Sequence, residues 1–202
     1  MSDEIRSGLP VLVLADAPAF ERWLAGSPNV AGAWLKFAKQ GSGAVTLSKD
    51  AAIDSALCYG WIDGQLGRYD ETYFVTRFTP RGARSRWSQI NCVRVERLIL
   101  AGRMRPAGLA QVEAAKADGR WEAAYPSAKS APTPEDFRRA LDASPKAAQA
   151  FERLDGANRY AFLYRLHHAR DEAARAKTIA RLVGMLEQGE TFHPKTERDR
   201  AD

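Results

Sequence analysis

Apolar residues in the first part of the chain follow alternating helix and strand spacings. Residues 16–25 place their apolar side chains on one helical face, with Asp16 before them as an N-cap. Residues 31–39 alternate as a strand does, with Leu35 and Phe37 sharing one face. A helix followed by a strand at these lengths predicts a sheet with helices packed against it.

The alternation of elements continues to residue 78. Residues 48–59 have helical spacing, and Ser48 is the expected N-cap. The glycine-punctuated stretch 60–67 ends this helix and predicts either a strand or a tight turn. Residues 72–78 form the strongest strand pattern in the chain, and we expect Phe78 to face the core.

Two further helices are expected before residue 120. Ser88 caps a helix that runs to about Ala101, and Pro106 opens another that Gly119 ends. The inner face of the Ser88 helix is predicted to consist of Cys92, Val95 and Ile99.

Residues 122–135 contain three prolines among small and polar residues, which is typical of a linker. Residues 136–193 have helical spacing, and 194–202 lack an apolar anchor and predict a disordered tail. The predicted fold class is therefore α+β. A small mixed sheet with helices occupies residues 1–121, and the Pro-rich linker leads to an all-helical C-terminal domain.

Composition adds that the chain is an ordinary globular protein. It has 202 residues, 45% hydrophobic and 27% charged, and no apolar run approaches a membrane span. The first residues carry acids where a signal peptide needs bases, and the apolar run LPVLVLA is short and contains Pro10. We expect a cytoplasmic protein whose two cysteines, Cys58 and Cys92, are reduced thiols.

Positive charge is concentrated in one stretch. Residues 77–105 hold eight arginines against Glu96 alone, whereas residues 1–76 carry six basic and nine acidic side chains. Concentrated charge of one sign favours an anionic partner. Four arginines lie within ten positions before the Ser88 helix: Arg77, Arg81, Arg84 and Arg86.

Arginines that lead into a helix start are suited to binding an anion. Guanidinium groups hold phosphate or carboxylate oxygens two at a time, and the helix start at Ser88 and Asn91 adds hydrogen-bond donors. Trp87 could stack on a ring or a guanidinium. Two alternatives stay open: the arginines pair with the acidic N-terminal segment while Trp87 is core, or the loop forms a nucleic-acid surface.

The motif GWIDGQ adds a carboxylate to this set. Asp63 could accept backbone hydrogen bonds in a turn, pair with an arginine, or act as an acid or base if buried. An enzyme acting on an anionic substrate is thus an alternative, although no catalytic residue is assigned. The predicted ligand-binding residues are Trp61, Asp63, Gln65, Arg77, Arg81, Arg84, Trp87, Ser88 and Asn91.

No metal site and no cofactor are expected. His167 and His168 are adjacent, so on a helix they point about 100° apart and cannot bind one metal together, and His193 lies apart from them. The chain has no phosphate-binding loop, nucleophile elbow or dinucleotide fingerprint. Acids interleave with the bases of the C-terminal helices, which favours a solvated face over a surface for a partner protein.

Four segments carry a resemblance to a known family: ALCYGWIDGQ (56–65), RFTPRGARSRWSQIN (77–91), ERLILAGRMRPAGLAQVEAAKADGRW (96–121) and NRYAFLYRLHHARDEAARAKTIARLVGMLEQGE (158–190). They resemble the bacterial YdeI or OmpD-associated proteins, also labelled bacteriocin-protection proteins. The resemblance implies a small cytoplasmic bacterial protein with an α+β part, a helical C-terminal part and a role in envelope stress or antimicrobial tolerance. It supplies no reaction, so the predicted function remains the binding of a small anionic molecule.

Overall fold

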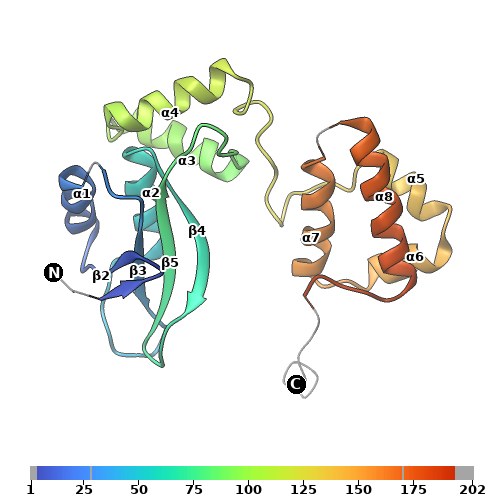
Figure 1. Ribbon diagram of the computed structural model, residues 1–202, viewed down its shortest axis with the longest axis horizontal. Coiled ribbons are helices and arrows are strands. Elements are labelled where there is room, and N and C mark those ends of the chain that lie inside the picture. The colour runs from blue at the N-terminus through green and yellow to red at the C-terminus, as the bar shows by residue number, and fades with distance from the viewer. Residues whose placement is uncertain (1–3, 28, 170, 194–202) are drawn as a thin grey trace. The chain divides into compact units, whose positions relative to one another are not determined.

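The computed structural model describes residues 4–27, 29–169 and 171–193 (Figure 1). Contacts within the chain divide it into two compact units, Met1–Ala124 and Tyr125–Asp202. The predicted tail, 194–202, lies outside the described residues.

The first unit is built on a five-stranded mixed sheet. Its spatial order is β1-β2-β3-β5-β4. β2 and β3 run parallel, and the other neighbouring pairs run antiparallel. This confirms the predicted α+β class with a small mixed sheet. The strands are β1 (Ile5–Arg6), β2 (Leu9–Val13), β3 (Ala33–Ala38), β4 (Trp61–Arg68) and β5 (Tyr73–Pro80).

Helices of the first unit begin where the sequence places their caps. The side chains of Asp16, Ser48 and Ser88 each accept the backbone N–H three residues further on, which satisfies a donor that a helix start leaves free. The helices are α1 (Ala17–Gly26), α2 (Lys49–Cys58), α3 (Gln89–Leu100) and α4 (Pro106–Ala117).

α1 and α2 pack on one face of the sheet, where Leu35, Phe37 and Phe78 meet Phe20 in the largest core of this unit (Figure 1). α2, α3 and α4 enclose a second core. The opposite face of the sheet carries a smaller apolar cluster: Leu9, Val11, Trp34 and Val75. The sheet therefore buries apolar side chains on both faces.

Three details differ from the sequence-based expectation or complete it. The short run that contains Pro10 is a strand, β2, which lies beside the two-residue strand β1, where a proline is tolerated. The ambiguous stretch after α2 is a strand, β4. The expected place of Ile99 on the inner face of α3 is wrong. Ile99 is 39% exposed, and Leu98 is buried instead because it points toward α4 and α2.

The second unit is all helical, as expected. Its helices are α5 (Glu135–Asp142), α6 (Pro145–Glu152), α7 (Gly156–His167) and α8 (Glu172–Glu187). Phe137, Phe151, Phe162 and Leu182 form the centre of its core. None of the helices described in either unit is long and apolar enough to cross a membrane.

Candidate functional site

The arginine loop is a folded turn between β5 and α3. It leaves the sheet at Arg81, whose backbone N–H donates to the carbonyl of Gly60 at 2.9 Å. The N–H of Gly82 donates to Ser85 Oγ at 3.0 Å, and the N–H of Ser85 donates to the Gly82 carbonyl at 2.9 Å. These reciprocal bonds fix the backbone of residues 82–85.

Arg81 points into the protein. Its side chain is 6% exposed, and its guanidinium carbon lies 3.5 Å from the centre of the Trp87 ring. One guanidinium nitrogen also donates to the carbonyl of Arg86 at 3.3 Å. Arg81 therefore connects the two ends of the loop by stacking and hydrogen bonding.

A second support comes from the segment after α4, which the sequence did not connect with the loop. Arg120 donates to the carbonyl of Ser85 at 2.8 Å and is also paired with Asp118. The rings of Trp121 and Trp87 are 4.9 Å apart, and Lys116 lies over Trp121. In the sequence, the one pointer to these residues is that they lie at the end of the helix that Pro106 opens. That position does not specify which loop they would contact.

Arg84 and Arg86 are exposed at the outer side of the same loop. Within the part of the chain that the structure describes, neither guanidinium has a carboxylate partner. Arg77 is also exposed, but it belongs to the sheet, where it pairs across the ladder with Trp34. Its side chain leaves the face opposite to that of Phe78, so it does not join Arg84 and Arg86 in the loop.

The residues of the GWIDGQ motif lie in β4. The Asp63 carboxylate is 3.8 Å from Lys49 Nζ at the start of α2. Trp61 is 6% exposed and packs edge-on against Trp23, so it is a core residue. Gln65 is exposed at a bulge between Asp63 and Leu66.

Ser88 and Asn91 form the cap of α3. Ser88 Oγ accepts the Asn91 N–H at 3.2 Å, and Asn91 is 8% exposed. The Ser88 hydroxyl is therefore committed to the helix start.

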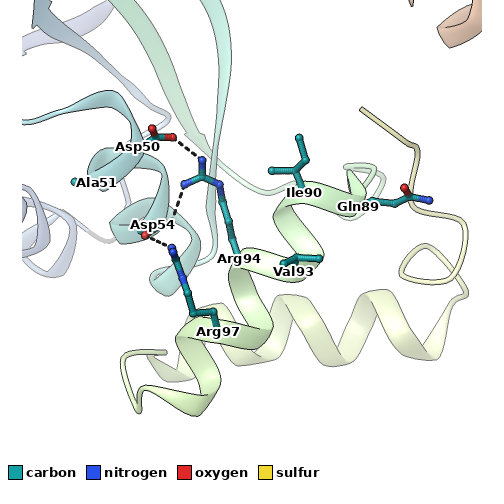
Figure 2. Close-up of a pocket in the computed structure, with 8 residues that line it drawn as sticks. All are labelled: Asp50, Ala51, Asp54, Gln89, Ile90, Val93, Arg94 and Arg97. Atoms are coloured by element: carbon teal, nitrogen blue, oxygen red, sulfur yellow. Dashed lines mark hydrogen bonds and ion pairs between the residues drawn. The ribbon is translucent and has the colours of Figure 1, made fainter. Parts of the chain in front are cut away.

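A separate open groove of about 620 Å³ lies between α2 and α3 (Figure 2). Arg94 donates to Asp50 at 2.5 Å and to Asp54 at 3.0 Å, and Arg97 donates to Asp54 at 2.5 Å. Burial opposes the charge on Arg94, but the hydrogen bonds to the two carboxylates outweigh it and raise the pKa of Arg94. Ala51, Gln89, Ile90 and Val93 complete the lining.

Both cysteines, Cys58 and Cys92, are free and buried. Burial raises the pKa of the Cys58 thiol and raises that of Cys92 to about 11, so both thiols are protonated at neutral pH. Across residues 4–27, 29–169 and 171–193, no group of three or more His, Cys, Asp and Glu side chains could hold a metal ion.

The fold and the loop define a two-unit protein in which an α+β unit carries an arginine-bearing loop and an all-helical unit follows it. Residues 130–189 match the family described as "Bacteriocin-protection, YdeI or OmpD-Associated", which confirms the resemblance for this part of the chain. Residues 12–111 match a different family model, "Domain of unknown function (DUF8412)". The segments 56–65 and 77–91 lie inside that second match. No curated protein and no solved structure matches the chain.

Proposed function

We propose that the chain is a binding protein whose loop 81–88 recognises a small molecule that carries phosphate or carboxylate groups. Arg84 and Arg86 would contact the anion, and Arg81 would hold the loop in place from inside. In this proposal the protein acts in the cytoplasm, where buried thiols such as Cys92 stay reduced. The binding would serve the bacteriocin protection that the description of the matched family names.

The observation that supports the proposal best is the contrast between the two sides of the loop. On the inner side, Arg81 stacks on Trp87 and Arg120 donates to Ser85, so the backbone is fixed before any ligand arrives. On the outer side, Arg84 and Arg86 face solvent. A preformed loop loses little conformational entropy on binding. Guanidinium groups that each contribute little binding energy can therefore still bind an anion together.

The expected affinity is modest. A guanidinium that is exposed to water gains about 0.2–1 kcal/mol from an opposite charge, and more when the bond is bidentate and partly buried. At about 1 kcal/mol each, Arg84, Arg86, Lys116 and Arg120 together give about 4 kcal/mol, which corresponds to a dissociation constant of about 1 mM. Screening by salt should weaken this binding.

A chemical reaction is not part of the proposal. Asp63 is the acid that the sequence offers for catalysis, and its carboxylate is 3.8 Å from Lys49 Nζ. The pair lies between β4 and α2, whereas Arg84 and Arg86 lie in the loop that follows β5. No observed contact joins Asp63 to either arginine among the described residues.

The test is a titration with inorganic phosphate, adenosine triphosphate and citrate at low salt, followed by tryptophan fluorescence and thermal shift. The variant Arg84→Ala/Arg86→Ala should bind at least about tenfold more weakly, which corresponds to a loss of about 1.4 kcal/mol. The matched control, Arg139→Ala/Arg153→Ala, removes two exposed arginines from the helical unit and should bind like the wild type. Equal weakening in both double variants would mean that general charge, and not the loop, attracts the ligand.

The nucleic-acid alternative is separated in the same experiment by a single-stranded oligonucleotide. Binding through many phosphates falls steeply with salt concentration, with a slope set by the number of contacts. A shallow slope with all probes supports a small anion, and a steep slope with the oligonucleotide alone contradicts the proposal.

A further inference from the structure

α3 has apolar residues on two opposite faces. Its inner face buries Cys92, Val95 and Leu98 in the core that it shares with α2 and α4. Its outer face carries Ile90, Val93 and Leu100, which are 49%, 65% and 90% exposed. A surface helix ordinarily has one apolar face and one polar face, and a helix that is apolar on both sides is ordinarily covered on both.

The outer face borders the groove between α2 and α3 (Figure 2). Ile90 and Val93 line it from α3, together with Arg94 and Arg97, and Asp50 lines it from α2. The side chain of Asp50 is 81% exposed and that of Arg97 is 63% exposed. The groove therefore presents an acid, a base and an apolar strip along one surface.

The residues of the strip have the spacing of a helix-pairing seam. Ile90, Val93, Arg97 and Leu100 follow one another at intervals of three, four and three positions, as the a and d positions of a heptad do. α3 has 12 residues, so these four positions span almost its full length. Such a seam packs against another helix that carries the same spacing.

We infer that the outer face of α3 binds the same face of a second copy of this chain, with the two α3 helices antiparallel about a two-fold axis. In an antiparallel pair each a position faces a d position of the other helix. A two-fold axis beside the middle of α3 then sets Ile90 against Leu100 of the second copy and Val93 against Arg97 of the second copy. In this register Ile90 and Leu100, the two ends of the strip, are each covered by the other residue of the second copy.

Charge complementarity favours a second copy over an unrelated partner. In this register Arg97 of the second copy crosses Val93 on the side of the groove where Asp50 lies, and the symmetry repeats the contact. Within one copy Asp50 is bonded to Arg94 and Arg97 to Asp54, but both side chains stay largely exposed, so each can take a second partner across the interface. The two-fold axis repeats that contact, as in any isologous interface. The aliphatic part of Arg97 covers Val93 while its charged end reaches the acid.

The first test is sedimentation velocity and light scattering over a range of concentrations from micromolar to submillimolar. The wild type should show a reversible monomer–dimer equilibrium. Ile90→Glu should raise the dimer dissociation constant roughly a hundredfold or more, because the symmetry sets two unpaired carboxylates against Leu100 of the facing copy. Val45→Glu is the matched control, since Val45 is 86% exposed in the same unit but outside α3, and it should dimerise like the wild type.

The second test fixes the register. The double variant Ile90→Cys/Leu100→Cys should form a disulfide between two copies under mild oxidation, because positions 90 and 100 face each other. Neither single variant should do so at a comparable rate, since two copies of position 90 lie at opposite ends of the seam. Tryptophan fluorescence checks that each variant is folded.

A wild-type chain that stays monomeric at every concentration overturns the inference. A dimer that Ile90→Glu leaves intact overturns it as well, because the contact would then lie elsewhere. Efficient cross-linking of Ile90→Cys alone would indicate parallel helices and contradict the antiparallel register.

Discussion

Arg81 stacks on Trp87, with 3.5 Å from the guanidinium carbon to the ring centre, and only 6% of the Arg81 surface is exposed to solvent. The buried arginine of the basic loop is therefore an internal support of that loop. Its charge remains close to Arg84 and Arg86, but its contacts are with the protein. This relationship separates the residues that hold the loop from those that face solvent.

Replacing Arg81 should destabilise the first unit. Arg81→Ala removes a buried cation–π contact and a hydrogen bond, and we expect a loss of about 1–3 kcal/mol in the free energy of unfolding. All five tryptophans lie in Met1–Ala124, so denaturation followed by their fluorescence reports on this unit alone. Arg84→Ala is the matched control and should stay within about 0.5 kcal/mol of the wild type. Equal stability of the two variants would contradict an internal role for Arg81.

A close crossing of α2 and α4 should make Gly108 irreplaceable. A Cβ atom at Gly108 would lie 2.3 Å from the carbonyl oxygen of Cys58, a distance that only a shift of the two helices can relieve. Gly108→Ala should therefore lower the unfolding free energy by about 3 kcal/mol or more, measured by tryptophan fluorescence.

A glycine-to-alanine substitution at a helical position with free space around it should raise stability, in contrast to Gly108→Ala. Gly184 lies within α8, and nothing lies within 4 Å of a Cβ atom built there. Gly184→Ala should stabilise the helical unit by about 0.5–1 kcal/mol, measured by circular dichroism, because alanine loses less backbone entropy in a helix. Destabilisation by both substitutions would show that available space does not explain the effect at Gly108.

The stability of the helical unit should depend on one carboxylate at low pH. Hydrogen bonds from Arg175 lower the pKa of Asp136, although partial burial acts against them. At pH values above the ordinary aspartate pKa of about 3.9, the ionised carboxylate therefore stabilises the folded state in full. This contribution is lost as the pH falls through the lowered pKa of Asp136 in the folded state.

Asp136→Asn should consequently cost about 1 kcal/mol at pH 7, because both side chains are about one third exposed. The difference from the wild type should shrink as the pH falls below the folded-state pKa. Asp142→Asn changes an exposed aspartate of the same helix and should leave the pH profile as it is. A constant difference between Asp136→Asn and the wild type at all pH values would exclude the ion pair as its cause.

Both cysteines should be inert toward thiol reagents in the folded protein. Burial raises the pKa of Cys92 to about 11, so at pH 8 only about one thiol in a thousand is ionised. A colorimetric disulfide reagent should therefore label neither Cys58 nor Cys92 until denaturant is added. An exposed cysteine introduced by Val45→Cys should react at once, and rapid labelling of the wild type would reveal that the core between α2 and α3 opens.

The local pattern of the sequence determined the elements and several of their ends. The caps Asp16, Ser48 and Ser88 could be predicted because a cap needs only a side-chain oxygen and the N–H three residues on. The alternation of Leu35 and Phe37 likewise identified the core face of β3. These features depend on residues that are neighbours in the chain.

Tertiary structure alone decided which charged groups meet. The partner of Asp63 is Lys49, and the second support of the loop comes from Arg120 and Trp121, more than 30 positions after it. Charge and spacing could place Arg81 in the loop but could not show that it points inward, because this depends on the position of the Trp87 ring. Long-range packing sets the direction of a flexible side chain, and a local sequence pattern contains no information on it.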